Sequence, residues 1–315
     1  MIKTTNKICL IAMIIGFLFM SMSCSKESYF LTIEVNPPEA GSATGEGEYK
    51  SGEVIKLTAL ENAGYQFASW TAEGDYVSTE LNADYKMPAR DITLKASFYI
   101  PGQSVTDIDG NTYPTVIIGQ QEWMAENLRV TRFNDGTPIP HLTESSDWVQ
   151  LTTPAYCWYN NDEAGNKTPY GALYSWFVIE GQRKSGEKIC PEGWHVPTDA
   201  EWSGLIRFLD PNSDPNELQE SLIAGGKLKA VGTTHWKNPN KGATNETGFA
   251  GIPGGFRDQG GNFVQKGDLG RWWSADAHPT YGSAWWRSIE AGSARIARHH
   301  LLKRQAKSIR CIKDQ

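Results

Sequence analysis

The chain has 315 residues, a formal net charge of −6 at neutral pH, 12 tryptophans and 5 cysteines. This length suffices for two domains with buried cores, and the net negative charge argues against nucleic acid as a partner of the chain as a whole. Eleven of the tryptophans follow residue 100, which indicates two parts of different composition.

The N-terminus has the organisation of an export signal. Lys3 and Lys7 precede an apolar run over residues 8–20, and small residues lead to Cys24. A cationic segment, a short apolar segment and small residues at the cut are typical of a secretory signal peptide, whereas a spanning helix needs about 20 apolar residues. We therefore expect removal of residues 1–23 and acylation of Cys24.

An acylated Cys24 would anchor the protein to the outer membrane, on its periplasmic or its surface-exposed face, with residues 24–28 as a lipidated tether. Signals of this kind usually carry Leu or a similar residue three positions before the cysteine, where this chain has Ser21. The alternative is an ordinary cleaved signal and a freely secreted protein.

Residues 29–99 predict a small all-β module. Apolar and polar residues alternate over 31–35, 55–59 and 92–98, with the period of two that half-buried strands show. The further pattern consists of Gly52, Gly64-Tyr65, Phe67, Trp70 and Ala96-x-Phe98. It resembles the internalin-type B-repeat of bacterial surface proteins, which implies a spacer.

Residues 100–104 predict a linker, and residues 105–315 the second domain. Asp109-Gly110 between strand-like runs predicts a hairpin. A calcium loop that begins at Asp107 is the alternative, but the Glu at the twelfth position of an EF-hand loop is not in place. The turn is therefore favoured.

Two helices are predicted in this domain. Thr198 and Glu201 form a capping box, and an apolar stripe then continues to Leu209, before Asp210-Pro211. The second helix is expected over residues 170–179. Short strand-like pieces follow Gly225-Gly226, so the order predicts an α+β domain with long loops.

Seven strings occur in a fixed order from residue 107 to Cys311. They are Asp107-Ile108-Asp109-Gly110-Asn111-x-Tyr113, Gln121-Glu122-Trp123-Met124-Ala125-Glu126-Asn127-Leu128, Tyr170-Gly171-x-Leu173-Tyr174-x-Trp176, Cys190-Pro191-x-Gly193-Trp194-His195-Val196-Pro197-Thr198-x-x-Glu201-Trp202, Gly248-Phe249-x-x-x-Pro253-Gly254-Gly255, Trp272-Trp273-Ser274 and Ser308-Ile309-Arg310-Cys311. Together they resemble the Fibrobacter succinogenes major paralogous domain, which is common in secreted lipoproteins of the Bacteroidetes and Fibrobacteres.

The resemblance implies an α+β fold of the C-type-lectin-like kind, preceded here by the small all-β module. It also implies a Cys190–Cys311 disulfide, a pairing that the cysteine count leaves open, with Cys157 unpaired. Formylglycine-generating and related metal-dependent oxidases share this general fold. Because the resemblance gives Cys190 and Cys311 a structural role, we expect neither catalysis nor a cofactor.

The sequence lacks the usual catalytic signatures, including a Gly-x-Ser-x-Gly elbow, a His-Glu-x-x-His helix and a Cys-x-x-Cys pair. His195 could act as a base, but no nucleophile or second ligand is adjacent, so a structural role that bonds nearby backbone is favoured. His299 and His300 would point to opposite faces of a strand, which argues against a shared metal.

The candidate binding residues lie within the polar loop 274–284 and on either side of it. They are Trp272, Trp273, Asp276, His278, Trp285, Trp286 and Arg287. Exposed indole rings beside charged groups suit the stacking of a sugar ring. Since adjacent residues on a strand point to opposite faces, we expect one tryptophan of each pair to be exposed and the other to enter the core.

Residues 287–313 contain eight Lys or Arg, which favours a solvated strand face that meets anionic glycans over a nucleic-acid site. The sequence thus predicts an envelope lipoprotein whose larger domain binds a glycan or a surface protein, in an oligomeric state that stays open. The alternatives are an adhesive or structural component without a discrete pocket and a metal-dependent oxidase.

Overall fold

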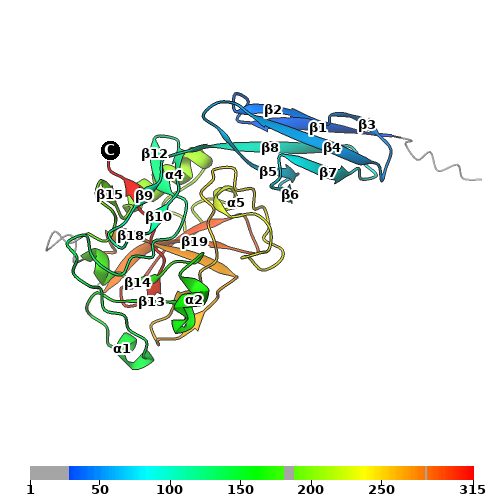
Figure 1. Cartoon of the computed structure of the whole chain (residues 1–315). Coiled ribbons are helices and arrows are strands. Elements are labelled where there is room, and N and C mark those ends of the chain that lie inside the picture. The colour runs from blue at the N-terminus through cyan, green and yellow to red at the C-terminus, as the bar shows by residue number, and fades with distance from the viewer. Residues whose placement is uncertain (1–27, 181–187, 281) are drawn as a thin grey trace, which may run out of the picture.

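The computed structural model describes residues 28–180, 188–280 and 282–315, so the expected signal peptide and Cys24 lie outside the described residues. It consists of an elongated β module and a larger, loop-rich domain (Figure 1). The described chain is mostly β-sheet with few helices. In the described ranges, none of the helices combines the length and the apolarity that crossing a membrane requires.

The N-terminal module is a sandwich of two sheets. The first sheet contains β1 (Tyr29–Asn36), β3 (Gly47–Tyr49), β5 (Gln66–Ala72), β6 (Asp75–Ser78) and β8 (Ile92–Pro101), and the second contains β2 (Gly41–Thr44), β4 (Val54–Glu61) and β7 (Asn82–Lys86). The alternation predicted for the second sheet is confirmed, because Ile55 and Leu57 are buried while Lys56 is exposed. These side chains meet Trp70 and Leu94 of the first sheet in one core.

Strand β8 carries the chain directly into the larger domain. Its last residues, Ile100 and Pro101, pair with Ile117 and Val116 of β11 (Thr115–Ile118). The expectation of a linker over 100–104 is therefore wrong for its first two residues, because the backbone groups of Ile100 and Pro101 lie in strand pairing. Beyond β11 the same sheet continues through β12 (Gln121–Met124), β22 (Ile312–Lys313) and β15 (Trp194–His195).

Side-chain contacts reinforce this junction. The hydroxyl of Ser69 in the module donates to the carbonyl oxygen of Thr244 in the domain at 2.6 Å. Gly248 has a φ of +68° and approaches the module so closely that a Cβ atom would lie 2.4 Å from the ring of Tyr99. Both the backbone conformation and the space therefore require glycine at this contact.

The predicted hairpin at Asp109-Gly110 is confirmed by β9 (Val105–Thr106) and β10 (Thr112–Tyr113). The Asp107 carboxylate accepts from the backbone N–H groups of Asp109 and Asn111 and from the hydroxyl of Tyr113. The Asp109 carboxylate accepts from Thr131 and Arg132. Hydrogen-bond donors of the protein itself thus bind the carboxylates of Asp107 and Asp109, as expected for a turn.

Of the two predicted helices, one is confirmed. Helix α4 (Asp199–Leu209) begins after Thr198, which forms the capping box with Glu201. The helix expected over 170–179 is wrong for residues 170–176, where β14 (Leu173–Ser175) pairs with β13 (Tyr156–Cys157) and β21 (Ala306–Lys307). Helical structure begins only at Phe177. Pairing with distant strands thus overrides the local apolar period.

The remaining elements of the larger domain are short or lie in one further sheet. They are α1 (Ser145–Val149), the 3-10 turn η1 (Tyr159–Asn161), α2 (Glu163–Asn166), α5 (Ala224–Leu228), β16 (Phe256–Arg257), β17 (Phe263–Val264), β18 (Leu269–Ala277), β19 (Ser283–Glu290) and β20 (Ile296–Leu302). The expected α+β mixture is therefore weighted heavily towards β.

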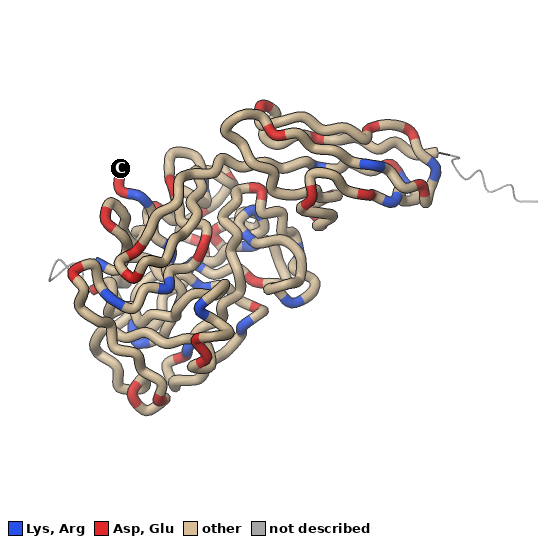
Figure 2. Tube along the Cα trace, viewed as in Figure 1, with Lys and Arg blue, Asp and Glu red and all other residues tan. Residues whose placement is uncertain are grey.

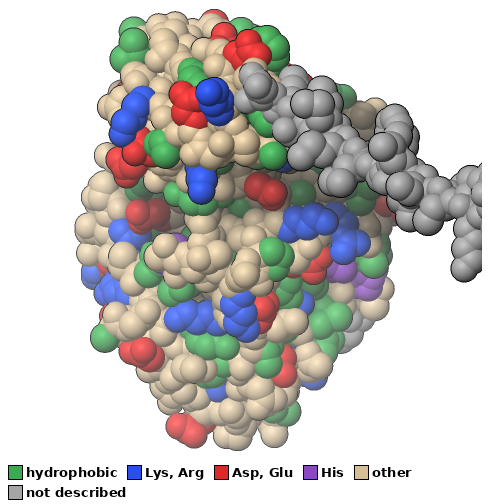
Figure 3. Space-filling view, turned by 90° about the vertical axis from the view of Figure 1, so that its right-hand side faces the viewer, with side chains coloured by type: hydrophobic (Ala, Val, Ile, Leu, Met, Phe, Trp, Pro, Cys, Tyr) green, Lys and Arg blue, Asp and Glu red, His purple; other side chains and the backbone are tan. Residues whose placement is uncertain are grey.

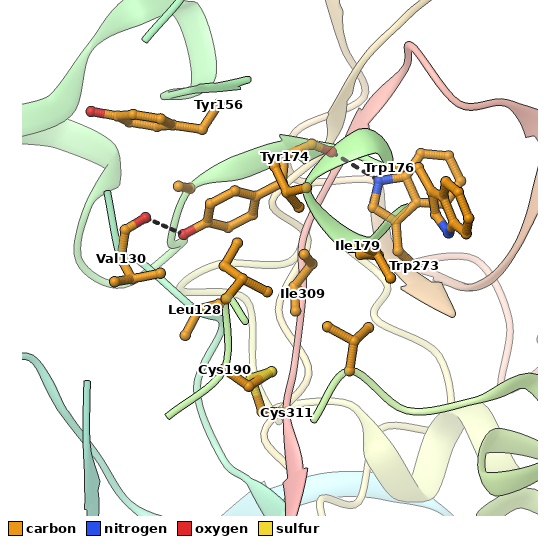
Figure 4. Close-up of a cluster of buried hydrophobic side chains, with 14 of the residues drawn as sticks. Leu128, Val130, Tyr156, Tyr174, Trp176, Ile179, Cys190, Trp273, Ile309 and Cys311 are labelled. Atoms are coloured by element: carbon orange, nitrogen blue, oxygen red, sulfur yellow. Dashed lines mark hydrogen bonds between the residues drawn. A yellow bond between two sulfur atoms is a disulfide. The ribbon is translucent and has the colours of Figure 1, made fainter. Parts of the chain in front are cut away.

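An aromatic core closed by a disulfide fixes the loops of this domain (Figure 4). Tyr174 donates its hydroxyl to the carbonyl oxygen of Val130 at 2.7 Å and accepts the indole N–H of Trp273 at its own carbonyl oxygen, 2.8 Å away. The predicted disulfide between Cys190 and Cys311 is confirmed, and both cysteines are buried.

Cys157 is a buried free thiol. Burial raises its pKa to about 12, although the neighbouring Arg257 opposes the shift. Since thiolates rather than thiols are nucleophilic, Cys157 is protonated and unreactive in the folded protein.

Replacing Cys190 and Cys311 together by Ser should lower the free energy of unfolding by about 4–5 kcal/mol, because the bond closes a loop with a sequence separation of 121 residues. Urea denaturation of wild type and variant under oxidising conditions measures the difference, and wild type in reductant is the matched control. Equal stability of all three samples would contradict a structural role of the bond.

Candidate functional site

The predicted binding residues lie on the three-stranded sheet β18–β19–β20 and on the loop between its first two strands. Trp273 is paired with Trp286 and Trp286 with His299, whereas Arg287 is paired with Trp272 on one side and Arg298 on the other. Because side chains alternate along each strand, these two rows lie on opposite faces of the sheet.

Trp272 and Trp273 both enter the core, with exposed fractions of 1% and 0%. The expectation that one of them is exposed is therefore wrong. Trp272 packs against Trp202 of α4 and donates its indole N–H to Asn127 at 2.8 Å, while Trp273 belongs to the disulfide-closed core. The alternation argument fails because other elements cover both faces of β18.

In the second pair, Trp286 is buried and Trp285 only partly exposed, so neither is the fully exposed ring that was expected. Trp286 is 5% exposed and stacks on His299, with ring centroids 4.6 Å apart. Trp285 is half-buried, and the guanidinium of Arg298 lies 3.4 Å from the centre of its ring. The binding surface therefore cannot be a set of exposed tryptophans.

Arg287 is fully buried in an ionic network rather than directed at a ligand. Its guanidinium donates to Asp199 and to Glu220, each at 2.6 Å, and Asp199 also binds Arg298. These bonds hold the N-terminal turn of α4 on the sheet. The hypothesis that Arg287 contacts a ligand is therefore wrong.

Asp276 serves the same helix. Its carboxylate accepts from the backbone N–H of Asp199, the first residue of α4, at 2.7 Å. The first N–H groups of a helix have no partner within the helix, so this bond satisfies one of them. Asp276 accordingly connects β18 with α4.

Of the candidate binding residues predicted from the sequence, His278 lines a cavity. The cavity has a volume of about 780 Å³ and lies at the end of the sheet where β19 begins and β20 ends. Its walls are formed by Leu151, Thr152, Phe177, Glu180, His278, Pro279, Gly282, Ser283, Leu302, Lys303 and Arg304. We call this cavity the loop groove.

The loop groove joins an apolar wall to charged groups. Phe177 and Leu302 supply apolar surface. Lys303 is paired with Glu180 at 2.8 Å, and the buried Nε of Arg304 has no hydrogen-bond partner. Glu180 and Lys303 are 123 positions apart in the chain, and no shared motif marks Glu180, Lys303 and Arg304 as neighbours of His278 in the sequence.

His195 has a structural role, as predicted, although its partners are carboxylates rather than backbone groups. Nε2 lies 2.9 Å from Glu201, and Nδ1 lies 2.6 Å from Asp314. The bond to Glu201 raises the pKa of His195 against the effect of burial. Burial would raise the pKa of Glu201, but hydrogen bonds from His195 and Thr198 outweigh it and lower that pKa to about 2.

Replacing His195 by Gln should destabilise the protein most in acid. A raised pKa in the folded state stabilises fully below the unfolded value of about 6.5, and this contribution disappears as the pH rises through the folded pKa. Urea unfolding of wild type and variant between pH 5.5 and 9 measures the difference. A difference that stays constant or grows towards pH 9 would contradict the ion pairs.

His299 and His300 lie on opposite faces of β20, as predicted. His299 stacks on Trp286, whereas His300 stacks on His278 with ring centroids 3.6 Å apart. Burial, with Arg271 and other nearby cations, lowers the pKa of His299 to about 4, so it is neutral at pH 7. Within the described residues no three His, Cys, Asp or Glu side chains are grouped to hold a metal ion.

The fold and the groove define a two-part β-rich protein, in which a small sandwich leads by a continuous strand into a disulfide-closed domain with a polar cavity. Residues 116–313 match the Fibrobacter succinogenes major domain, and residues 31–100 match the divergent InlB B-repeat domain. The first match spans more than half of the chain, which therefore belongs to the Fibrobacter succinogenes major domain family. No curated protein matches the chain. No solved structure matches it either.

Proposed function

We propose that this protein is an exported envelope lipoprotein whose larger domain binds a polysaccharide in the loop groove. The observation that carries the proposal is the groove itself, where His278 and Ser283 from one loop meet Phe177 and Arg304 from distant segments. Clefts that combine apolar walls with a few polar groups are the common form of ligand sites.

The chemistry of the groove suits a sugar chain. The paired charges of Lys303 and Glu180 offer donors and acceptors to hydroxyl groups, and Arg304 adds a second cation to the lining. Phe177 supplies an aromatic surface against which the C–H groups of a ring can pack. A segment of a surface protein is the competing ligand, since it presents the same types of group.

The arrangement of the two parts supports a role away from the membrane. We assign the larger domain to the C-type-lectin-like class, in agreement with its disulfide between Cys190 and the end of the chain and its long loops. The N-terminal module acts as the spacer, and acylated Cys24 as its anchor. We assign the protein no catalytic activity and no cofactor.

The charge distribution favours neutral or locally charged ligands over nucleic acid. Acidic and basic side chains are interspersed along both parts of the chain (Figure 2) and on the face seen in Figure 3. Within the basic stretch 287–313, Arg287, Lys307 and Arg310 are buried. The expectation of a solvated basic face is therefore wrong for these three residues.

The double variant His278→Ala and Arg304→Gln should weaken glycan binding at least about tenfold, or about 1.4 kcal/mol, because it removes two polar groups of the groove. A glycan array identifies the ligand, and calorimetry then compares the variants. Lys237→Gln is the control, since it removes an exposed cation that pairs with Asp268 outside the groove. Equal binding by the double variant would contradict the site.

Absence of binding to any glycan or surface protein would instead favour the second candidate, an adhesive or structural envelope component. The mixed surface charge and the continuous strand between the two parts suit such a role as well. Binding assays with glycans and with surface proteins therefore decide between the two functions, whereas the double variant tests the location of the site.

Replacing Cys24 by Ser should abolish lipid attachment and release the protein from the membrane fraction, because the thiol is the acylated group. Metabolic labelling with an alkyne fatty acid and fractionation measure both effects. The Cys9→Ser variant is the control, since Cys9 lies within the expected signal peptide. Unlabelled wild-type protein in the culture medium would indicate the ordinary signal peptide.

A further inference from the structure

Several buried cations of the larger domain have a nearly complete set of hydrogen-bond acceptors. Arg257 and Lys229 donate to three backbone carbonyl oxygens each, at 2.7–3.0 Å. Arg287 is bound by two carboxylates. Such bonds are needed, because an uncompensated buried charge is strongly destabilising.

Arg271, near the start of β18 and partly exposed, has fewer such acceptors. Its buried Nε has no partner, and its Nη2 has only a long bond of 3.4 Å to the side chain of Gln265. The guanidinium otherwise lies over aromatic rings, 3.6 Å from the centre of Phe256 and 4.6 Å from that of Trp286. No acidic side chain among the described residues forms an ion pair with it.

Arg271 lines a cavity in which a ligand could offer acceptors to the terminal nitrogens of its guanidinium. The cavity has a volume of about 240 Å³ and lies on the face of the sheet that carries His299. It is lined by Leu218, Gln219, Leu269, Arg271, Ser288, Glu290, Arg295, Ala297 and His299. We call it the arginine cavity. Pockets for drug-sized ligands measure roughly 300–1,000 Å³, so its size suits a single sugar ring or a smaller group.

The one carboxylate that lines the arginine cavity is already engaged. Glu290 accepts from the hydroxyl of Ser293 at 2.7 Å and from Arg295 at 3.1 Å. Arg271 therefore has no carboxylate partner among the described residues, and Ser288 lies directly opposite on β19 as a hydroxyl donor. A ligand with its own carboxylate would complete the arrangement.

We propose that the arginine cavity binds the carboxylate of an acidic sugar residue, such as a uronic acid. The forked donors of a guanidinium match the two oxygens of a carboxylate. Ser288 and the ring of His299 are placed to bind hydroxyl groups, and the apolar side chains of Leu269 and Ala297 line the walls beside the ring. The site lies at the opposite end of the sheet from the loop groove and does not depend on the function proposed there.

The probe is methyl glucuronide, and methyl glucoside, which lacks the carboxylate, is its matched control. We expect the full mature protein to bind the glucuronide at least about tenfold more tightly than the glucoside in calorimetry. Equal affinities would overturn the proposal. A peptide with a free C-terminal carboxylate tests the other source of this group, and tighter binding of that peptide than of the glucuronide would overturn the assignment to a sugar.

The matched variant is Arg271→Met, which keeps an unbranched side chain of similar reach but removes the charge. Glucuronide affinity should fall at least tenfold, and a cooperative thermal transition close to that of wild type shows that the variant is folded. Unchanged glucuronide affinity would overturn the site.

Two further variants guard against a general effect on folding. Arg271→Lys keeps the charge but loses the fork, and should weaken glucuronide binding less than Arg271→Met does. Arg304→Gln alters the loop groove and should leave glucuronide affinity unchanged. If Arg304→Gln weakened binding as much as Arg271→Met, the sugar would lie in the loop groove and the proposal would be wrong.

Discussion

Buried cations that donate to backbone carbonyl groups hold the larger domain together. Much of this domain is loop, and buried carbonyl groups outside regular structure need a donor from elsewhere. Arg257 donates to the carbonyl groups of residues 142, 143 and 261, and Arg310 donates to those of residues 249 and 250. Each cation thereby joins segments far apart in the chain. Charge-assisted bonds of this kind offset the cost of burying the charge, and they give the loops fixed positions.

The ionic network of Arg287 extends this principle to the one long helix of the described domain. Asp199 and Glu220 receive the guanidinium, and Asp276 receives the first N–H of α4. Four side chains thus orient α4 on the sheet, while the Cys190–Cys311 bond fixes the chain on the other side. The loop groove lies beyond both constraints, where β19 begins and β20 ends.

Sequence patterns correctly predict the local features that depend on residues a few positions apart in the chain. The alternation around Ile55, the capping box of Thr198 and the turn at Gly110 each follow from residues a few positions apart, and all were confirmed. The fate of Trp272, Trp273 and Arg287 was not predictable in this way. A period of two assigns a residue to a face, but it does not say what covers that face. The same limit explains why a helix is wrongly expected before Phe177, since β14 there pairs with strands at residues 156–157 and 306–307. It also explains why the loop groove is not predicted, because the residues of its walls are distant in sequence.

The direction of the first strand has a mechanical consequence. β1 and β8 are parallel over six residue pairs, from Leu31–Ile92 to Asn36–Ser97, and β8 then enters the larger domain. Tension between the start of β1 and that domain would therefore pull the two strands in opposite directions along their length. The hydrogen bonds between them would carry the force together, in shear, rather than opening one after another. A protein held at one end and bound to a ligand at the other would resist flow through this pair of strands.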